Sequence, residues 1–242
     1  MRRTAKLAIL MLATVLIWLA SPQLAWPARA AVVVLLSALP WLTLEQRHFA
    51  HEIPETLKRR EVYATTAVAV WVLALTCVFA AFAGGFTSTT LGLRTLPIPQ
   101  LLGWSIASTV LGLGVMAVGR LLDVRETTLL RFLLPRTTAE RAGFIALSLS
   151  AGVAEELVFR AFLVSALILV TGSAWLSVSV ASLAFGVLHA YQGSAGIVRT
   201  AVLGAVLAIP FLLTGSIVPS MIAHAAINIA AGLWLARWLL RS

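Results

Sequence analysis

The chain has 242 residues, of which 60% are hydrophobic and only 11% are charged, and its mean hydropathy is +0.98. A soluble domain carries about 25% charged residues, so this composition excludes a soluble protein and indicates an integral membrane protein. The formal net charge is +9, but the basic residues lie mainly between apolar segments. That pattern is typical of topology signals and of contacts with anionic lipid headgroups, so we expect the lipid bilayer, and no nucleic acid, as a partner.

Eight apolar segments follow one another, each about long enough to cross a ~30 Å hydrocarbon core as a helix. They run approximately over residues 7–24, 28–44, 62–83, 100–119, 142–170, 173–190, 197–213 and 217–240. The sequence therefore predicts an all-α fold, a polytopic transmembrane helix bundle with about eight spans. The first segment follows basic residues and also fits a signal peptide, but Leu24 and Trp26 extend it toward spanning length, which favours a retained helix.

The basic residues are distributed asymmetrically when eight spans are threaded from a cytoplasmic N-terminus. The predicted inner segments hold Arg2, Arg3, Lys6, Arg47, Lys58, Arg59, Arg60, Arg120, Arg125, Arg131, Arg136, Arg141, Arg199, Arg237 and Arg241. The predicted outer segments hold only Arg29 and Arg94, and Arg160 lies inside a span. Because cytoplasmic segments are enriched in Lys and Arg, this asymmetry predicts that both termini are cytoplasmic.

Three charged residues interrupt the fifth apolar segment, in the stretch Ala154–Arg160. A Glu or Arg in mid-span costs roughly 2.5–3.5 kcal/mol on insertion scales, so such groups are paired or functional by default. Glu156 and Arg160 are spaced i, i+4 with the acid first, the favourable order for an ion pair on a helix. That pairing leaves Glu155 available as a general base.

Polar residues also lie within the sixth and eighth segments: His189 ends the stretch Phe185–His189, and His224 and Asn228 share one helix face at i, i+4. Counted from the outer span ends at 1.5 Å per residue, Glu155 and His189 lie about 24 Å deep, Asn228 about 18 Å and His224 about 12 Å. A carboxylate and an imidazole can deprotonate water, and an amide with a second imidazole can stabilise an oxyanion. The four residues therefore suffice for hydrolysis of an amide by activated water.

Two other interpretations remain open. Two histidines and a glutamate could bind zinc in a membrane metalloprotease, although no helix carries HExxH and His51-Glu52 lies in a loop without a second histidine at i+4. The chain could also be a non-catalytic membrane immunity or scaffold protein that binds a peptide, or a small transporter with Glu155 as a proton site. Chelator sensitivity and the effect of Glu155→Gln distinguish these interpretations from a glutamate-dependent peptidase.

Three short patterns occur in order on successive predicted helices: EExxFR at Glu155–Arg160, FxxxH at Phe185–His189 and HxxxN at His224–Asn228. Together they resemble the CPBP family, which comprises the CAAX prenyl protease type II enzymes, also called Abi proteins or glutamic intramembrane endopeptidases. The stretch Leu133–Arg136 is similar to the lead-in that usually precedes the first motif. The resemblance covers roughly residues 130–235.

The resemblance implies that Glu155 activates water with the help of His189, and that His224 and Asn228 form the oxyanion hole. It implies a supporting role for Glu156 and Arg160. We expect Phe185 to be a supporting residue as well. The resemblance implies no cofactor and no metal. Residues 131–242 would form the intramembrane protease core, and residues 1–130 would supply transmembrane helices and cytoplasmic loops of unknown role.

The resemblance also bears on substrate and location. Eukaryotic members remove the tripeptide after a prenylated cysteine, whereas bacterial relatives are linked to peptide maturation, bacteriocin self-immunity or trimming of membrane anchors. The short loops and compact size of this chain are typical of bacterial proteins. We therefore expect a multi-pass protein of the bacterial inner (plasma) membrane that cleaves a membrane-anchored protein or peptide.

Overall fold

The computed structural model describes residues 3–46, 53, 56–121 and 127–235 of the chain. These ranges contain helices, turns and loops and no strand, which confirms the predicted all-α class. Several residues discussed above lie outside the described residues: Arg2, Arg47, His51, Glu52, Arg125, Arg237 and Arg241.

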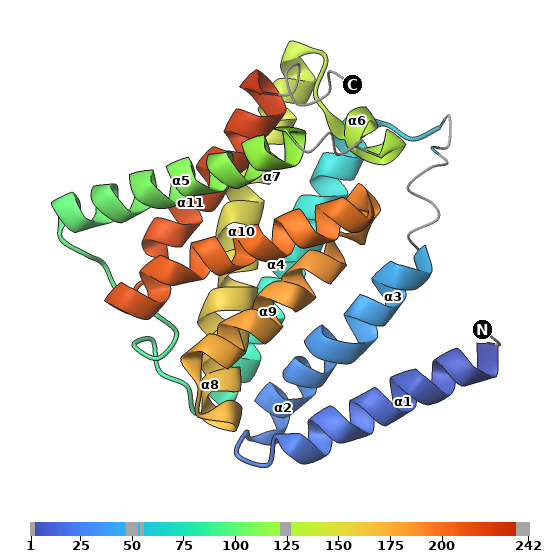
Figure 1. The fold of residues 1–242 in the computed structure, drawn as a ribbon, viewed down its shortest axis with the longest axis vertical. Coiled ribbons are helices and arrows are strands. Elements are labelled where there is room, and N and C mark those ends of the chain that lie inside the picture. Colours follow the sequence, from blue (N-terminus) through green and yellow to red (C-terminus); the bar gives the residue numbers. More distant parts are fainter. Residues whose placement is uncertain (1–2, 47–52, 54–55, 122–126, 236–242) are drawn as a thin grey trace.

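Long helical rods follow one another through the described chain, and successive rods run in opposite directions (Figure 1). The first half holds α1 (Arg3–Ala20), the continuous rod α2 (Trp26–Val33), η1 (Val34–Ala38) and α3 (Leu39–Gln46), then α4 (Arg59–Ala83) and α5 (Ile98–Leu121). The second half holds the rod α7 (Thr138–Glu156), η3 (Leu157–Val164) and α8 (Ser165–Thr171), then α9 (Ala174–Leu188), α10 (Gly193–Thr214) and the rod α11 (Val218–Ile229) and η5 (Ala230–Trp234). Two short helices, α6 (Thr128–Leu133) and η4 (Ala190–Gln192), lie in the connections. Each rod overlaps one of the eight predicted apolar segments, the last of which extends past the described residues. The helix α1 ends at Ala20, so Leu24 and Trp26 do not lengthen it as predicted.

Four of the described helices are long and apolar enough to cross a membrane: Trp26–Gln46, Arg59–Ala83, Ile98–Gly119 and Ala190–Thr214. Shorter apolar helices occupy Thr4–Ala20, Ala174–Leu188 and Val218–Leu233. Large apolar side chains on the outer helices, such as Leu12, Val68 and Ile106, are exposed, as expected of surfaces that face lipid. The chain is thus a multi-pass membrane protein; the number of spans and their orientation stay predictions.

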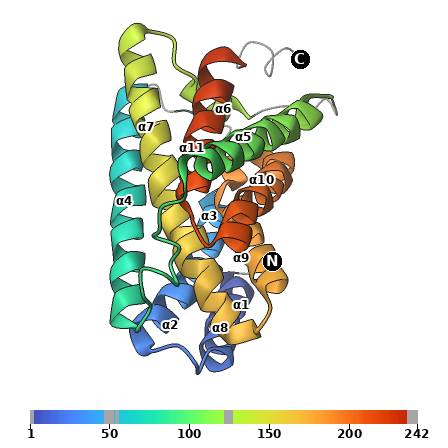
Figure 2. The same cartoon turned by 90° about the vertical axis from the view of Figure 1, so that its left-hand side faces the viewer.

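The rod α7–η3–α8 is packed against several other helices (Figure 2). The α7 part contacts α4 and α11, and the η3 part contacts α4 and α9. Every side chain from Val158 to Val164 is buried. This rod carries the three charged residues of the fifth apolar segment. Because it is enclosed by other helices, its charges face protein and not lipid, which is the arrangement that makes them tolerable inside a membrane.

The start of α7 is fixed by a capping box. The Thr137 side chain accepts from the Glu140 backbone N–H, and the Glu140 carboxylate accepts from the backbone N–H groups of Thr137 and Arg136 at 3.0 and 2.8 Å. These backbone donors, with smaller help from Arg59, hold the pKa of Glu140 below its ordinary value. The box sets where the helix begins, and therefore how far along it the catalytic candidates lie.

The loop between α4 and α5 covers one end of the bundle. Leu91 of this loop is buried, the Ile217 N–H donates to the Gly92 carbonyl at 3.1 Å, and the Ser165 hydroxyl donates to the Thr90 carbonyl at 2.9 Å. Gly92 has φ +67°, and a Cβ there would lie 2.6 Å from the Phe211 ring, so only glycine fits. The loop ties α8 and the α10–α11 turn together at the end remote from the cavity described next.

Candidate active site

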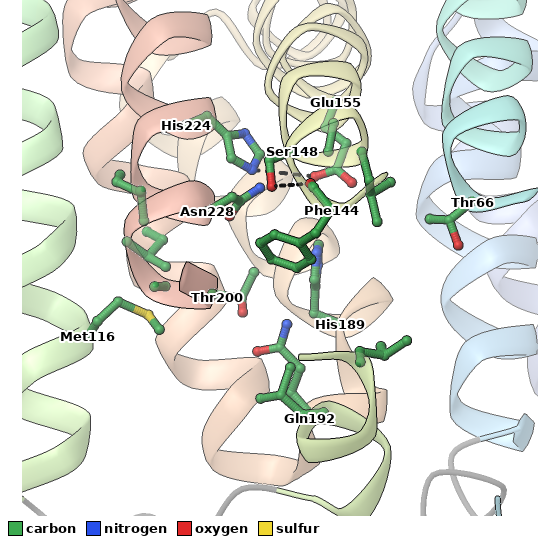
Figure 3. Close-up of a pocket in the computed structure, with 18 of the residues that line it drawn as sticks. Thr66, Met116, Phe144, Ser148, Glu155, His189, Gln192, Thr200, His224 and Asn228 are labelled. Carbon is green, nitrogen blue, oxygen red and sulfur yellow. Dashed lines mark hydrogen bonds and ion pairs between the residues drawn. The ribbon is translucent and has the colours of Figure 1, made fainter. Parts of the chain in front are cut away.

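A cavity of about 220 Å³ lies toward the opposite end of the bundle, lined by residues of α4, α6, α7, α10 and α11 among others. Its wall includes Glu155, His189, His224 and Asn228, which come from α7, the end of α9 and α11 (Figure 3). All four residues that the sequence singles out thus line one space. Most of the remaining wall is apolar, with Phe144 and Leu133 among its members.

Glu155 and His224 face each other across the contact between α7 and α11. The His224 Nε2 atom lies 3.7 Å from Glu155 Oε2, and the Glu155 side chain is 18% exposed, toward the cavity. The two helices approach closely because Gly152 lies against Ala225: a Cβ on Gly152 would be 2.8 Å from the Ala225 backbone nitrogen. Small residues at such contacts let membrane helices pack at short distance, and here they bring Glu155 and His224 together.

Glu156 makes a different set of contacts although it is the next residue. It is completely buried, and its Oε1 atom accepts from Arg160 Nη1 at 2.7 Å, so the ion pair expected from the i, i+4 spacing is present. Arg160 Nη2 donates to the Gly204 carbonyl at 3.0 Å. The same Glu156 Oε1 lies 2.7 Å from His224 Nδ1. Because a carboxylate accepts, His224 Nδ1 carries the proton and its Nε2 atom is the one that points at Glu155.

His189 lies just beyond α9, which ends at Leu188, and the chain then passes through η4 and reverses at Gly193, φ +84°. Its Nδ1 atom is 2.8 Å from the Phe185 carbonyl, so Nδ1 donates and Nε2 is left for a ligand in the cavity. The backbone break at the helix end thus turns the imidazole into the site.

The Phe185 ring lies between the other site residues. Its centroid is 4.6 Å from that of His189 and 5.9 Å from that of His224, where the rings are perpendicular. The Arg160 guanidinium carbon lies 4.7 Å from the ring centroid on its face, a favourable cation–π geometry. Phe185 therefore contacts both imidazoles and the buried cation at once.

The amide of Asn228 makes no hydrogen bond within the part of the chain that the structure describes, and it lines the cavity. Sequence reasoning missed several further polar residues of the wall, namely Tyr191, Gln192, Arg199 and Thr200. They follow His189 on η4 and α10, and their closeness in sequence to His189 is the signal that could have indicated them. The contact between Glu156 and His224 was also missed, because no spacing rule connects residues on helices so far apart in sequence.

Among the described residues, no group of three His, Cys, Asp or Glu side chains is arranged to hold a metal ion. The buried carboxylate of Glu156 is directed to Arg160 and His224, and His189 Nδ1 is directed to a backbone carbonyl. The donors of the site are thus engaged mainly with one another.

Comparison with known proteins finds a match to one protein family. The model of the family described as Type II CAAX prenyl endopeptidase Rce1-like matches residues 137–230, which is the stretch from the N-cap of α7 to the end of α11 and contains every candidate site residue. No curated protein and no solved structure matches the chain. The match confirms the resemblance seen in the three motifs. Residues 137–230 of this multi-pass membrane protein therefore match the type II CAAX prenyl endopeptidase Rce1-like family, a family of membrane proteases.

Proposed function

We propose that the chain is a glutamic intramembrane endopeptidase, which hydrolyses a peptide bond of a membrane-associated protein or peptide with water activated by Glu155. The observation that carries the proposal is the pairing of the Glu155 carboxylate with His224 at 3.7 Å in a cavity that also presents His189 and Asn228. The family match supports the protease class, and the geometry supports the glutamate mechanism.

In the first step, a water molecule held between Glu155 and His189 Nε2 attacks the scissile carbonyl carbon. Glu155 takes one proton from this water while the oxygen forms the new C–O bond, and the carbonyl electron pair moves onto the carbonyl oxygen. A tetrahedral oxyanion results. The partial exposure of Glu155 to the cavity gives water access to its carboxylate.

The oxyanion is stabilised by the Asn228 amide and by His224 Nε2–H. For His224 to donate there while Nδ1 donates to Glu156, both ring nitrogens must carry protons. The two carboxylates, Arg160 and the imidazolium then sum to zero charge, which makes the buried Glu156 and the partly buried Glu155 tolerable in the membrane. Donors aimed at the position where charge develops are worth about 10²- to 10³-fold in rate each.

In the last step the C–N bond breaks and its electron pair stays with the nitrogen. Glu155 or His189 returns the proton to this leaving amine, and the other product carries the new carboxyl group. Asp, Cys and Ser nucleophiles are not required, because water supplies the new oxygen. Phe185 supports this chemistry by holding the two imidazoles.

The substrate side of the proposal follows from composition and location. A cavity within the bundle fits a substrate that is itself anchored in the bilayer, and the short connections and compact size favour the bacterial inner (plasma) membrane. We further propose that residues 131–242 are the protease core and that residues 1–130 take part in substrate choice. In support, Tyr63 and Thr66 of α4 and Met116 of α5 line the cavity.

The test compares purified wild type with Glu155→Gln for release of labelled peptide from a library of membrane-anchored peptides, in parallel with and without chelator. We expect cleavage by the wild type and a loss of about 10²- to 10⁴-fold in the variant, since Gln keeps the size of the side chain but cannot accept the proton. Thr76→Val, on the lipid-facing side of α4, is the matched control and should cleave normally.

The outcomes separate the alternatives. Equal cleavage by wild type and Glu155→Gln would remove Glu155 from the chemistry. Cleavage that appears only without chelator would favour the zinc metalloprotease. Peptide binding without cleavage in any member of the library would favour the immunity or scaffold interpretation.

A further inference from the structure

A strip of polar side chains leads from the proposed oxyanion hole along one wall of the cavity. It consists of Asn228 on α11, Thr200 on α10 and Gln192 on η4, which follow one another in Figure 3 from the level of His224 to beyond His189. Apolar side chains such as Phe144 and Met116 also line this part of the cavity, and Tyr191 and Arg199 are further polar members of its wall. The cavity thus presents a strip of polar side chains among apolar ones.

Thr200 is the unusual member of this strip. Hydroxyls in membrane helices commonly bond back to the carbonyl four residues earlier, as those of Thr65, Thr76, Thr109 and Thr214 do here at 2.7–2.8 Å. Thr200 is only 5% exposed, yet its hydroxyl has no hydrogen-bond partner among the described residues. The hydroxyl is therefore open to the cavity, where a ligand or water can form the hydrogen bond that the protein does not supply.

Gln192 is held in place at the other end of the strip. Its Nε2 atom donates to the Tyr191 hydroxyl at 3.2 Å, and its Oε1 atom accepts from Arg199 Nη2 at 3.0 Å. Each amide atom can make one further hydrogen bond. Gln192 therefore presents a fixed donor and a fixed acceptor, in contrast to the unengaged hydroxyl of Thr200.

We propose that Thr200 is a substrate-binding residue, whose hydroxyl bonds the main chain of an extended, apolar peptide segment that lies along the strip, with Gln192 bonding the same main chain further on. A helical segment cannot use such a strip, because its backbone N–H and C=O groups are bonded to one another. An extended segment offers both groups, and its apolar side chains fit against the apolar residues of the cavity wall. The substrate class is thus an apolar segment that is locally unwound. Hydrogen bonds to its main chain do not depend on its side chains, and they would determine which peptide bond lies at the proposed catalytic residues.

This inference rests on the proposed function for its setting, but its test measures binding and needs no cleavage. The protein is the full chain in lipid nanodiscs, in the Glu155→Gln background so that the probe survives. The probe is a fluorescein-labelled apolar hexapeptide, in a series where each backbone amide in turn is replaced by an ester. The ester removes the N–H donor and weakens the carbonyl acceptor at one position without changing a side chain.

In the Glu155→Gln protein with Thr200 unchanged, we expect an ester at one position of the peptide to weaken binding about 3- to 10-fold. This is the range of a single neutral hydrogen bond. In Thr200→Val, which keeps the shape and removes only the hydroxyl, the parent peptide should bind that much more weakly, and the ester at that position should cost nothing more. Thr200→Ser should restore the discrimination. The control Thr76→Val should behave as the parent.

Two results would overturn the proposal: no binding of any hexapeptide in the series, or an ester profile that is the same with Val as with Thr at position 200. The result is independent of the cleavage experiment. Peptide binding that depends on Thr200 in a protein that never cleaves would retain this inference and remove the proposed enzyme. If the protein cleaves peptides but its ester profile does not depend on Thr200, the proposed enzyme would be retained and this inference removed.

Discussion

The Glu156 carboxylate serves two partners with one oxygen, since both Arg160 Nη1 and His224 Nδ1 lie 2.7 Å from Oε1. Its other oxygen, Oε2, is buried without a hydrogen-bond partner in the described structure. Glu156 is therefore more than a counter-charge for Arg160. By accepting from Nδ1, it determines which His224 nitrogen faces the cavity, in the way that a carboxylate orients a catalytic imidazole elsewhere.

This double role predicts that stability and activity can be separated. Arg160→Met or Glu156→Gln alone should destabilise the protein by about 3–5 kcal/mol, because each removes one charge from a buried set whose charges balance. The double variant should recover most of this loss, since it removes both charges. Its activity should still be lower by about 100-fold, because a neutral amide replaces the carboxylate that accepts from His224 Nδ1 and no longer stabilises the imidazolium.

Thermal unfolding in detergent and peptide release under the same conditions measure the two effects. If the double variant regained activity together with stability, Glu156 would be only a partner for Arg160. If Glu156→Gln left the unfolding midpoint unchanged, the assignment of a buried charge pair would be wrong.

At the scale of elements, the site depends on how closely α7 and α11 pack. Gly152 lies one turn before Glu155, and Ala225 is the neighbour of His224, so this glycine contact sets the separation of the two catalytic candidates. Both helices change to π-helical geometry soon afterwards, α7 at Leu157 and α11 at Ala230. Such π segments occur often at functional sites, because they rotate the side chains that follow relative to an α-helix.

Gly152→Ala tests the helix contact. The added Cβ would lie 2.8 Å from the Ala225 nitrogen and 3.0 Å from its Cα, so α7 and α11 must move apart. We expect a loss of about 1–3 kcal/mol in the free energy of unfolding, as for overpacking, together with a drop in peptide release.

The matched control is Gly103→Ala on α5, where a Cβ would meet nothing within 4 Å. There the same chemical change should raise stability by about 0.4–1 kcal/mol, because alanine restricts the unfolded chain. Equal unfolding midpoints for the two variants would show that the α7–α11 contact does not limit stability.

At the scale of the whole molecule, the two ends of the bundle differ. The loop between α4 and α5 packs over one end through Leu91 and its bonds to Ser165 and Ile217. The cavity lies toward the other end, under α6, whose Leu133 carbonyl accepts from the Tyr63 hydroxyl at 2.6 Å. With the topology predicted from the basic residues, the cavity end is cytoplasmic.

Thiol labelling tests this orientation. In a Cys77→Ala background, which removes the single cysteine, a membrane-impermeant maleimide should label Ser88→Cys in intact cells, because Ser88 lies in the loop remote from the cavity. It should label Lys58→Cys and the cavity residue Thr66→Cys only in inverted vesicles. Labelling of Thr66→Cys from the outside alone would contradict both the N-in topology and access of water from the cytoplasm.

The sequence by itself determined the helical class, the approximate positions of the rods and the residues that we propose for the chemistry. It could do so because a charge or a histidine inside an apolar segment is costly, so that Glu155, Glu156, Arg160, His189 and His224 stand out without a structure. It also determined the ion pair of Glu156 with Arg160, because helix geometry fixes which residues four apart can touch.

Only the tertiary structure decided which residues meet across helices. The bond from His224 to Glu156, the approach of α7 to α11 at Gly152 and the unengaged hydroxyl of Thr200 all depend on rotations and separations of helices that no local spacing encodes. In a lipid environment, where apolar surfaces gain little by leaving the solvent, these are set by the fit of small residues and by buried hydrogen bonds. The physical reason is that periodicity specifies a face of one helix, whereas a site requires the faces of several.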